Sequence, residues 1–285
     1  MSSSIDAVAN RTRQSPLPWA LWLRQVGAIF RSDLHKNFLG RRAILIYLLA
    51  LLPLFPLLVF AFVPGDWKNF NNFSLIYSAL YNGLILRTIV FFGCAWIFMN
   101  LFRGEIVDRS LHYYFLSAVR REVLVVGKYI SGLVTSIVLF TFTTVVGMLL
   151  LYLPSFYMQS VRYFTEGAGL TQLLTYAGIT ILACVGYGAF FVVVGLFVRN
   201  PIIPAVLLYG WEWLNFLLPP LLKKISVIHY LNSLVPIPVS EGPFAVVAEP
   251  TPAYIAIPSM LGVTIVVLVI AAYRIRHMEI RYGSD

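Results

Sequence analysis

Residues 79–102, ALYNGLILRTIVFFGCAWIFMNLF, contain one charged side chain, that of Arg87, in a run long enough to cross a membrane. A transmembrane helix needs about 17 to 25 mainly apolar residues. The run lacks the strict alternation of a barrel strand, and in lipid a helix satisfies its own backbone hydrogen bonds. Residues 79–102 therefore predict a transmembrane helix.

The rest of the chain has the same character. Hydrophobic residues make up 59% of the 285 residues, charged residues make up 12%, and the mean hydropathy is +0.82. So few polar side chains cannot cover a soluble globule. The apolar runs predict an all-α integral membrane protein with six spans, at residues 43–63, 79–102, 129–153, 173–198, 202–218 and 255–273.

Basic residues alternate across these spans. Sixteen of the 21 lysines and arginines lie in the N-terminal segment, in the loops after the second and fourth spans, or after the sixth span. Four lie in the alternate loops, and Arg87 lies inside a span. This positive-inside bias places both termini of a multi-pass protein in the cytoplasm. The net charge of +9 therefore orients the chain in the bilayer, and we expect no nucleic-acid partner.

The segments outside the spans differ in composition. Residues 1–16 predict a disordered cytoplasmic tail without a removable signal peptide, and residues 274–285 predict a second cytoplasmic tail. Between the fifth and sixth spans, prolines separate the apolar pieces ISVIHYLNSLV and PFAVVA, which predict short re-entrant or interfacial helices on the outer side. Residues 17–42 predict an amphipathic helix in the cytoplasmic interface, since apolar residues recur there at helical spacing. They are Trp19, Trp22, Leu23, Val26, Phe30 and Leu34.

The cytoplasmic loop after the second span interrupts the membrane domain with charges. After Asp108, which can cap a helix, four residues share one helical face at i, i+3, i+4 and i+7, namely Leu111, Tyr114, Phe115 and Ala118. An apolar face with two aromatic residues needs a surface to cover it, which is the membrane, the rest of the chain or a partner protein. The residues alone leave open a helix that lies on the bilayer with snorkelling arginines.

The stretch GEIVDRSLHYYFLSAVRREVLVVGKYISGL, residues 104–133, resembles the cytoplasmic loop of ABC-2 type ABC-transporter permeases, the transmembrane subunits of ATP-driven exporters. Val126-Gly127-Lys128 matches the apolar-Gly-Lys end of that loop, whereas Arg109-Ser110 stands where Gly-Thr is usual. Residues 29–54, IFRSDLHKNFLGRRAILIYLLALLPL, are similar to the first interfacial helix and first span of the family. In topology the resemblance covers the whole chain.

This resemblance implies a mechanism and a set of partners. The loop 103–128 would carry a coupling helix that docks into a groove on a separate ATP-binding subunit, with apolar residues in the groove and charged residues at its rim. Two such subunits, which bind ATP and Mg, would act on a homomeric or heteromeric dimer of permeases in the plasma membrane, the inner membrane of a bacterium. The implied partner-binding residues are Glu105, Asp108, Arg109, Leu111, Tyr114, Phe115, Arg120 and Arg121.

The chain shows no pattern typical of an active site. It has no G-x-x-x-x-G-K-[ST] string, so an ATPase has to come from another subunit. Its four histidines are dispersed and predict no metal site. No arrangement of serine, cysteine or paired carboxylates predicts a catalytic residue. We expect a transport subunit that is not an enzyme by itself and binds no cofactor.

Two charged residues lie at depth within the predicted spans. Arg87 and Glu212 stand roughly 22 and 16 Å above the cytoplasmic boundary, which is close enough to pair if the helices tilt. A charge at that depth needs a partner or a wet cavity. With Trp211 and Trp213, these residues either line or gate a translocation path or form a structural salt bridge, unless Arg87 reaches the outer interface. An exchange of the two charges that restored export would indicate a pair.

Two other functions fit the same residues. An ion-coupled secondary transporter would use Arg87 and Glu212 in a proton or substrate relay, although the chain shows no inverted repeat. A non-transporting membrane scaffold would use the amphipathic helix and the loop to recruit soluble proteins. The transported substrate does not follow from the sequence, because membrane helices are apolar whatever they move.

Overall fold

The computed structural model describes residues 19–40, 43–62, 70–107, 120–152, 157–198, 200, 202–239, 246 and 249–276. This part of the chain consists of helices and their connections, without a strand, as the sequence predicts. The longer helices are α2 (Trp19–Leu39), α6 (Phe91–Val107), α8 (Arg121–Tyr152), α10 (Gly169–Phe197), α11 (Ile202–Trp213) and α14 (Ala253–Arg276). The shorter elements are α3 (Ala43–Leu51), α4 (Leu54–Phe62), α5 (Phe70–Leu80), the π-helix η1 (Tyr81–Val90), α9 (Tyr157–Thr165), the 3-10 helix η2 (Leu214–Leu217), α12 (Pro220–Lys223) and α13 (Val227–Ser233).

Within the described ranges, five helical stretches are long and apolar enough to cross a membrane, which agrees with the predicted class of protein. They are Ala43–Phe62, Asn72–Glu105, Arg121–Tyr152, Gly169–Phe197 and Ala253–Arg276. The predicted span 202–218 is a shorter apolar segment, Ile202–Leu217. It ends where Leu218 becomes extended before Pro219 and Pro220, since the residue before a proline avoids the helical region. A sixth crossing stays a prediction.

The first of these stretches is interrupted by a proline. α3 ends at Leu51 and α4 begins at Leu54, with Pro53 between them. Pro53 has no N–H to donate, and its ring clashes with the preceding turn. Pro56 lies in the first turn of α4, where a backbone N–H would lack a helical partner in any case. The interruption therefore falls at Pro53.

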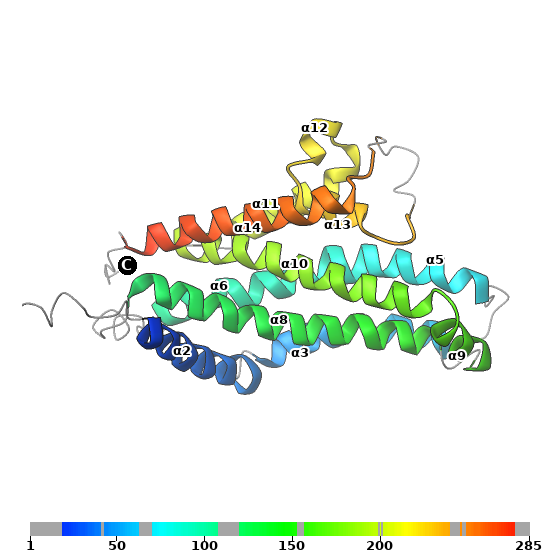
Figure 1. Cartoon of the computed structure of the whole chain (residues 1–285), viewed down its shortest axis with the longest axis horizontal. Helices are drawn as coiled ribbons and strands as arrows, with labels where there is room; N and C mark the ends of the chain where they lie inside the picture. The colour runs from blue at the N-terminus through cyan, green and yellow to red at the C-terminus, as the bar shows by residue number, and fades with distance from the viewer. Residues whose placement is uncertain are drawn as a thin grey trace, which may run out of the picture.

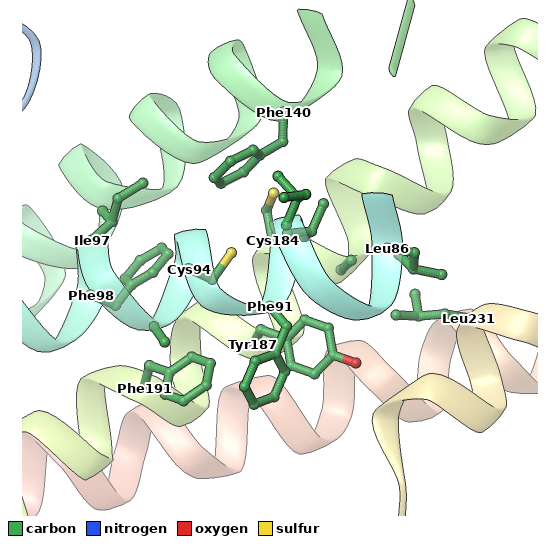
Figure 2. Packing of buried hydrophobic residues seen from close by; sticks show 14 of the residues in the cluster. Leu86, Phe91, Cys94, Ile97, Phe98, Phe140, Cys184, Tyr187, Phe191 and Leu231 are labelled. Carbon is green, nitrogen blue, oxygen red and sulfur yellow. The ribbon is translucent and has the colours of Figure 1, made fainter. Parts of the chain in front are cut away.

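α10 is the central helix of the bundle and packs against α6, α8 and α14 (Figure 1). Glycines let these helices approach closely. A Cβ on Gly195 would lie 3.1 Å from the backbone of Met99, and a Cβ on Gly188 would lie 2.5 Å from the ring of Phe98. Figure 2 shows aromatic side chains of α6, α8 and α10 packed together in this core.

One end of the bundle is formed by residues 19–40, 103–107, 120–128 and 274–276, and we call it the basic end. There the last turns of α6, α10 and α14 lie near α2 and the start of α8, whereas α5 and α9 lie at the opposite end (Figure 1). α11 leaves from the basic end after α10, and α14 returns to it. Between them, α12 and α13 fall in the region where the sequence predicts short helices.

α2 is the N-terminal helix predicted to be amphipathic, and it packs along α8. Its buried face carries Ile29 and Asp33, which are 6% and 3% exposed. Leu23, which belongs to the predicted apolar face, is 71% exposed, and Trp19 is 60% exposed. The helix therefore turns one side to the protein and leaves apolar side chains on another, as suits a helix at a membrane interface.

Candidate functional site

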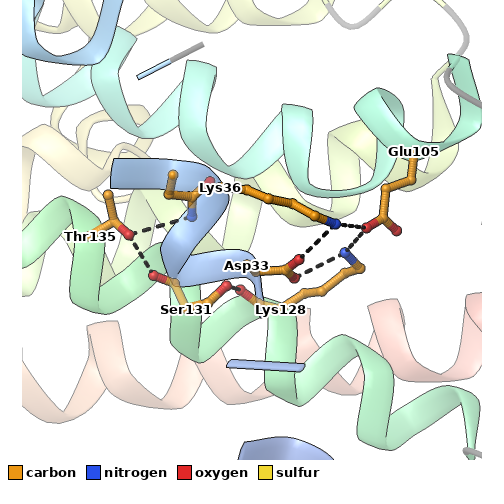
Figure 3. Close-up of polar contacts among 7 residues, drawn as sticks. Asp33, Lys36, Glu105, Lys128, Ser131 and Thr135 are labelled. Carbon is orange, nitrogen blue, oxygen red and sulfur yellow. Dashed lines mark hydrogen bonds and ion pairs between the residues drawn. The ribbon is translucent and has the colours of Figure 1, made fainter. Parts of the chain in front are cut away.

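Four charged side chains meet where α2, α6 and α8 pack together at the basic end. We call Asp33, Lys36, Glu105 and Lys128 the ionic cluster (Figure 3). The Nζ atom of Lys128 lies 3.0 Å from Oδ2 of Asp33 and 2.8 Å from Oε1 of Glu105. The Nζ atom of Lys36 lies 3.5 Å from Oε1 of Glu105 and 3.7 Å from Oδ1 of Asp33. Lys128 and both acids are buried and Lys36 is exposed, so one buried ammonium group joins three helices.

The local sequence explains how these groups come together. Asp33 and Lys36 are three residues apart on α2 and therefore face the same neighbours. Gly127, just before Lys128, allows α2 to approach α8, since a Cβ there would lie 3.0 Å from Cγ2 of Ile29. Ile29 is one turn before Asp33, so this close contact brings Asp33 level with Lys128. The Gly-Lys pair of the loop motif thus positions the N-terminal helix.

The ionic cluster has no net formal charge, because it holds two carboxylates and two ammonium groups. Its hydrogen bonds continue along α8: the Nδ2 of Asn37 donates to Oγ1 of Thr135 at 3.4 Å, and that hydroxyl donates to the carbonyl of Ser131 at 2.9 Å (Figure 3). A small cavity of about 130 Å³, lined also by Trp96 and Asn100, lies beside the cluster. The ion pairs of the cluster connect α2, α6 and α8. The arrangement therefore fixes these three helices to one another.

Among the described residues, no group of three or more His, Cys, Asp or Glu side chains is arranged to hold a metal ion. The two acids of the ionic cluster bind ammonium groups, which would compete with a cation for the same oxygens. The cluster therefore has the chemistry of ion pairing and none of the features that activate a nucleophile.

The predicted partner-binding residues fall into two sets. Five of the eight lie outside the described residues: Asp108, Arg109, Leu111, Tyr114 and Phe115. The other three contact their own chain. Glu105 is buried in the ionic cluster, the guanidinium of Arg120 lies 4.8 Å from the ring centroid of Trp22, and Arg121 donates to backbone carbonyls of α14. The rim contact predicted for Glu105 would require that it leave the cluster.

The start of α8 also holds the end of α14. The Nη1 of Arg121 donates to the carbonyl of Ile275 at 3.3 Å and to that of Arg276 at 2.9 Å. The last carbonyls of a helix have no intrahelical partner, so a cationic side chain satisfies them and interacts favourably with the helix dipole. Glu122 pairs with Arg276 in addition. Both flanks of the loop between α6 and α8 are therefore fixed to other helices of the bundle.

Glu212 has a structural partner at the start of α13. Its Oε1 accepts a hydrogen bond from the N–H of Val227 at 3.1 Å, and its Oε2 accepts from the N–H of Ile228 at 2.9 Å and from Oγ of Ser226 at 2.7 Å. The first N–H groups of a helix lack internal acceptors, and a carboxylate there is favoured by the helix dipole. This buried carboxylate therefore fixes α13 to α11.

Arg87 lies in η1 and interacts electrostatically with Glu212. Arg87 and Glu212 also interact electrostatically with Tyr187 of α10, which is buried. Trp211 is half-buried and Trp213 is 49% exposed. The structure thus brings Arg87 and Glu212 into one neighbourhood, while Trp213 lies at the surface of the chain. Their role in a translocation path stays a prediction.

Sequence reasoning missed two features. It did not single out the buried pair of Asp33 and Lys128, although Asp33 lies directly before Leu34 of the predicted apolar face, which was a signal that this acid could be buried. It also missed η1, in which Oγ1 of Thr88 donates to the carbonyl of Gly83 at 3.2 Å. π-helical turns inside α-helices are frequent at functional sites, and the residue types of η1 give no indication of one.

Neither of two comparisons with known proteins identifies a relative. A scan against models of protein families gives no match, and a search of curated proteins gives no significant match.

Proposed function

We propose that this chain is the transmembrane permease subunit of an ATP-driven exporter of the ABC-2 type. The observation that carries the proposal is the rigid attachment of both flanks of the loop 103–128. The ionic cluster joins the end of α6 and the start of α8 to α2, and Arg121 joins α8 to α14. A force applied to the loop would therefore move four helices together.

In the proposed mechanism, the loop 103–128 transmits movement of the ATP-binding subunits to the membrane-spanning helices. Leu111, Tyr114 and Phe115 fill a groove on an ATP-binding subunit, and Asp108 and Arg109 contact its rim. Two such subunits bind ATP and Mg, and their closure rocks two permease chains between inward-facing and outward-facing states. This chain itself binds no nucleotide and makes or breaks no covalent bond. The complex would lie in the inner membrane of a bacterium with both termini of the permease in the cytoplasm.

Coupling of this kind requires a stiff connection between the loop 103–128 and the membrane-spanning helices. A surface salt bridge contributes little rigidity, because water screens it and the side chains stay mobile. Lys128 is 0% exposed, and removal of one partner of a buried ion pair leaves an uncompensated charge. The ionic cluster therefore supports transmission of force better than the exposed pair of Arg162 and Glu166 at the opposite end would.

The rival hypothesis of an ion-coupled transporter depends on Arg87 and Glu212. Both carboxylate oxygens of Glu212 already accept hydrogen bonds from α13 and from Ser226. A relay that protonated this carboxylate would weaken the start of α13 in every cycle. These contacts favour a structural role for Glu212 and thereby favour the exporter. The scaffold hypothesis predicts a soluble partner protein that is not an ATPase.

The test is affinity purification of the detergent-solubilised protein from its native host, followed by an ATPase assay of the eluate. We expect the wild type to bring down an ATPase and Tyr114→Ala plus Phe115→Ala to lose it. The matched control is Tyr254→Ala plus Phe55→Ala, which removes one exposed tyrosine and one exposed phenylalanine elsewhere and should keep the ATPase.

The outcomes separate the three functions. An ATPase retained by the loop variant would remove the coupling role from Tyr114 and Phe115. A stable wild-type preparation that brings down no ATPase would overturn the exporter. Capture of a different soluble protein in its place would favour the scaffold.

A further inference from the structure

A crevice of about 350 Å³ opens at the basic end between α2, the start of α8 and the end of α14. This volume lies in the range of about 300–1,000 Å³ that is usual for ligand sites. The apolar part is formed by Trp19, Trp22, Leu23, Val26, Val123 and Val126, and the polar edge by Arg120, Glu122 and Arg276. The crevice therefore has one apolar and one charged region.

The apolar part is exposed where a membrane protein meets the interface. Trp19 is 60% exposed, Leu23 is 71% exposed and Val126 is 47% exposed. The rings of Trp19 and Trp22 meet edge to face at 5.0 Å. Tryptophan is enriched at the level of lipid headgroups because its ring is apolar and its N–H is polar. Lipid, which surrounds the protein at high concentration, is the natural cover for these side chains.

The polar edge carries an excess of positive charge. Arg120 and Arg276 face one acid, Glu122, which pairs with Nε of Arg276. The guanidinium of Arg120 lies 4.8 Å from the centroid of Trp22, so the wall of the crevice orients this cation. A guanidinium is planar and matches two oxygens of a phosphate at once. Charge complementarity therefore favours an anion beside the apolar trough.

We propose that this crevice binds an anionic glycerophospholipid of the cytoplasmic leaflet. Its phosphate contacts Arg120 and Arg276, and an acyl chain lies along Trp22, Leu23 and Val126. A free phosphate would leave the apolar part uncovered, and a neutral lipid would leave the excess charge unmatched. The bound lipid would fill the gap among α2, α8 and α14 and stabilise their junction. This site requires only a membrane protein and does not depend on export or on an ATPase.

The test is native mass spectrometry of the full-length protein in detergent, titrated with phosphatidylglycerol and with phosphatidylcholine of the same acyl chains. We expect saturable binding of phosphatidylglycerol that is tighter than binding of phosphatidylcholine. Arg120→Gln should weaken the binding of phosphatidylglycerol roughly fivefold, which is the usual effect of one basic residue at an anionic surface. Arg24→Gln removes an exposed arginine of α2 outside the crevice and serves as the control.

A second variant tests the apolar part without a change of charge. Val126→Phe should fill the trough and weaken the binding of both lipids, and it decides the question if Arg120→Gln is unstable. Equal affinity for the two lipids, or an equal loss for Arg24→Gln, would overturn the proposal in favour of general attraction. Absence of saturable binding of either lipid would overturn the proposal. Competition by soluble glycerol phosphate as strong as that by lipid would remove the acyl chain from the site.

Discussion

Lys128 brings an ammonium group completely out of water, and its surroundings show why the chain tolerates this. Two carboxylates from different helices lie within 3.0 Å of its Nζ atom. A second lysine, Lys36, balances the remaining charge from the exposed side. Removal of charged groups from water costs free energy, so the cluster is stable only while all four of its charged side chains are present. Lys128, the eighth residue of α8, thus holds this helix in contact with α2 and α6.

Substitution of Lys128 by methionine should lower the free energy of unfolding by about 3–5 kcal/mol, because Asp33 and Glu105 would stay buried against Lys36 alone. Thermal or chemical unfolding in detergent measures the loss. Lys128→Met plus Asp33→Asn removes one charge of each sign and should recover part of it. Lys224→Met, at an exposed position, should have little effect. Equal losses for the single and the double variant would contradict the role of charge balance.

The hydrogen bonds that Glu212 accepts from α13 determine how an exchange of charge between Arg87 and Glu212 is interpreted. An arginine at this position has only donors, and it cannot accept the N–H groups of Val227 and Ile228. We therefore expect Arg87→Glu plus Glu212→Arg to fail to restore function even though the two charges interact. The experiment suggested by the sequence alone does not separate a pair from a cap.

Hydrogen exchange at the start of α13 makes that separation. Glu212→Ala should speed the exchange of the amides of Val227 and Ile228, since the loss of a helix cap costs about 0.5–2 kcal/mol. Glu212→Gln retains one acceptor and should give an intermediate rate. Arg87→Gln leaves the cap in place and should change these amides least. Unchanged exchange in Glu212→Ala would show that the carboxylate does not cap α13.

At the scale of helices, close approach is set by glycine. α10 meets α6 at Gly188 and Gly195, and α2 meets α8 at Gly127. In lipid the hydrophobic effect does not drive helices together, so close van der Waals packing carries much of the association. The glycine in the loop motif therefore has a steric task that is separate from any partner protein.

Gly127→Ala should destabilise the protein by about 1 kcal/mol, because the new methyl group would lie 3.0 Å from Ile29. Gly27→Ala is the matched control on α2, where a Cβ meets nothing within 4 Å and where alanine is the better helix former. The double variant Gly127→Ala plus Ile29→Ala should lose less than the sum of the two single changes. Additive losses in thermal unfolding would argue against this contact.

At the scale of the whole molecule, the path of the chain between α10 and α14 decides the topology. α11 leaves from the basic end and α14 returns to it (Figure 1). The apolar segment Ile202–Leu217 is shorter than the five long apolar stretches of the described residues, and α12 and α13 follow it before the chain reaches α14. The positive-inside bias predicts that both termini are cytoplasmic, and a chain with both termini on one side of the membrane crosses it an even number of times.

Cysteine labelling in intact cells tests this path. Cys94 and Cys184 are buried, so the wild type gives a low background with a charged maleimide. We expect Lys224→Cys to react from the outer face, as Glu166→Cys on the far end of the bundle should. Arg24→Cys should react only after the membrane is opened. Labelling of Lys224→Cys only after opening would mean that the segment after α10 does not cross.

Hydropathy and charge are local properties, and for this reason the sequence alone predicts the membrane class, the long helices and a cytoplasmic assignment of the basic residues. The sequence also contains the prolines that follow the apolar run Ile202–Leu217. Whether a run of this length crosses the membrane depends on which helices pack beside it. The sequence likewise identified Arg87 and Glu212 as costly charges without revealing what each one contacts.

The partners of the buried charges were decided only by the tertiary structure. Asp33 and Lys128 are 95 residues apart in the chain, and no local pattern states that they share a hydrogen bond. The same holds for Glu212, whose acceptors are used by the backbone of a later helix. Burial and pairing depend on which helices meet, so composition can say that a charge needs a partner, and only the packed bundle can say which partner it has.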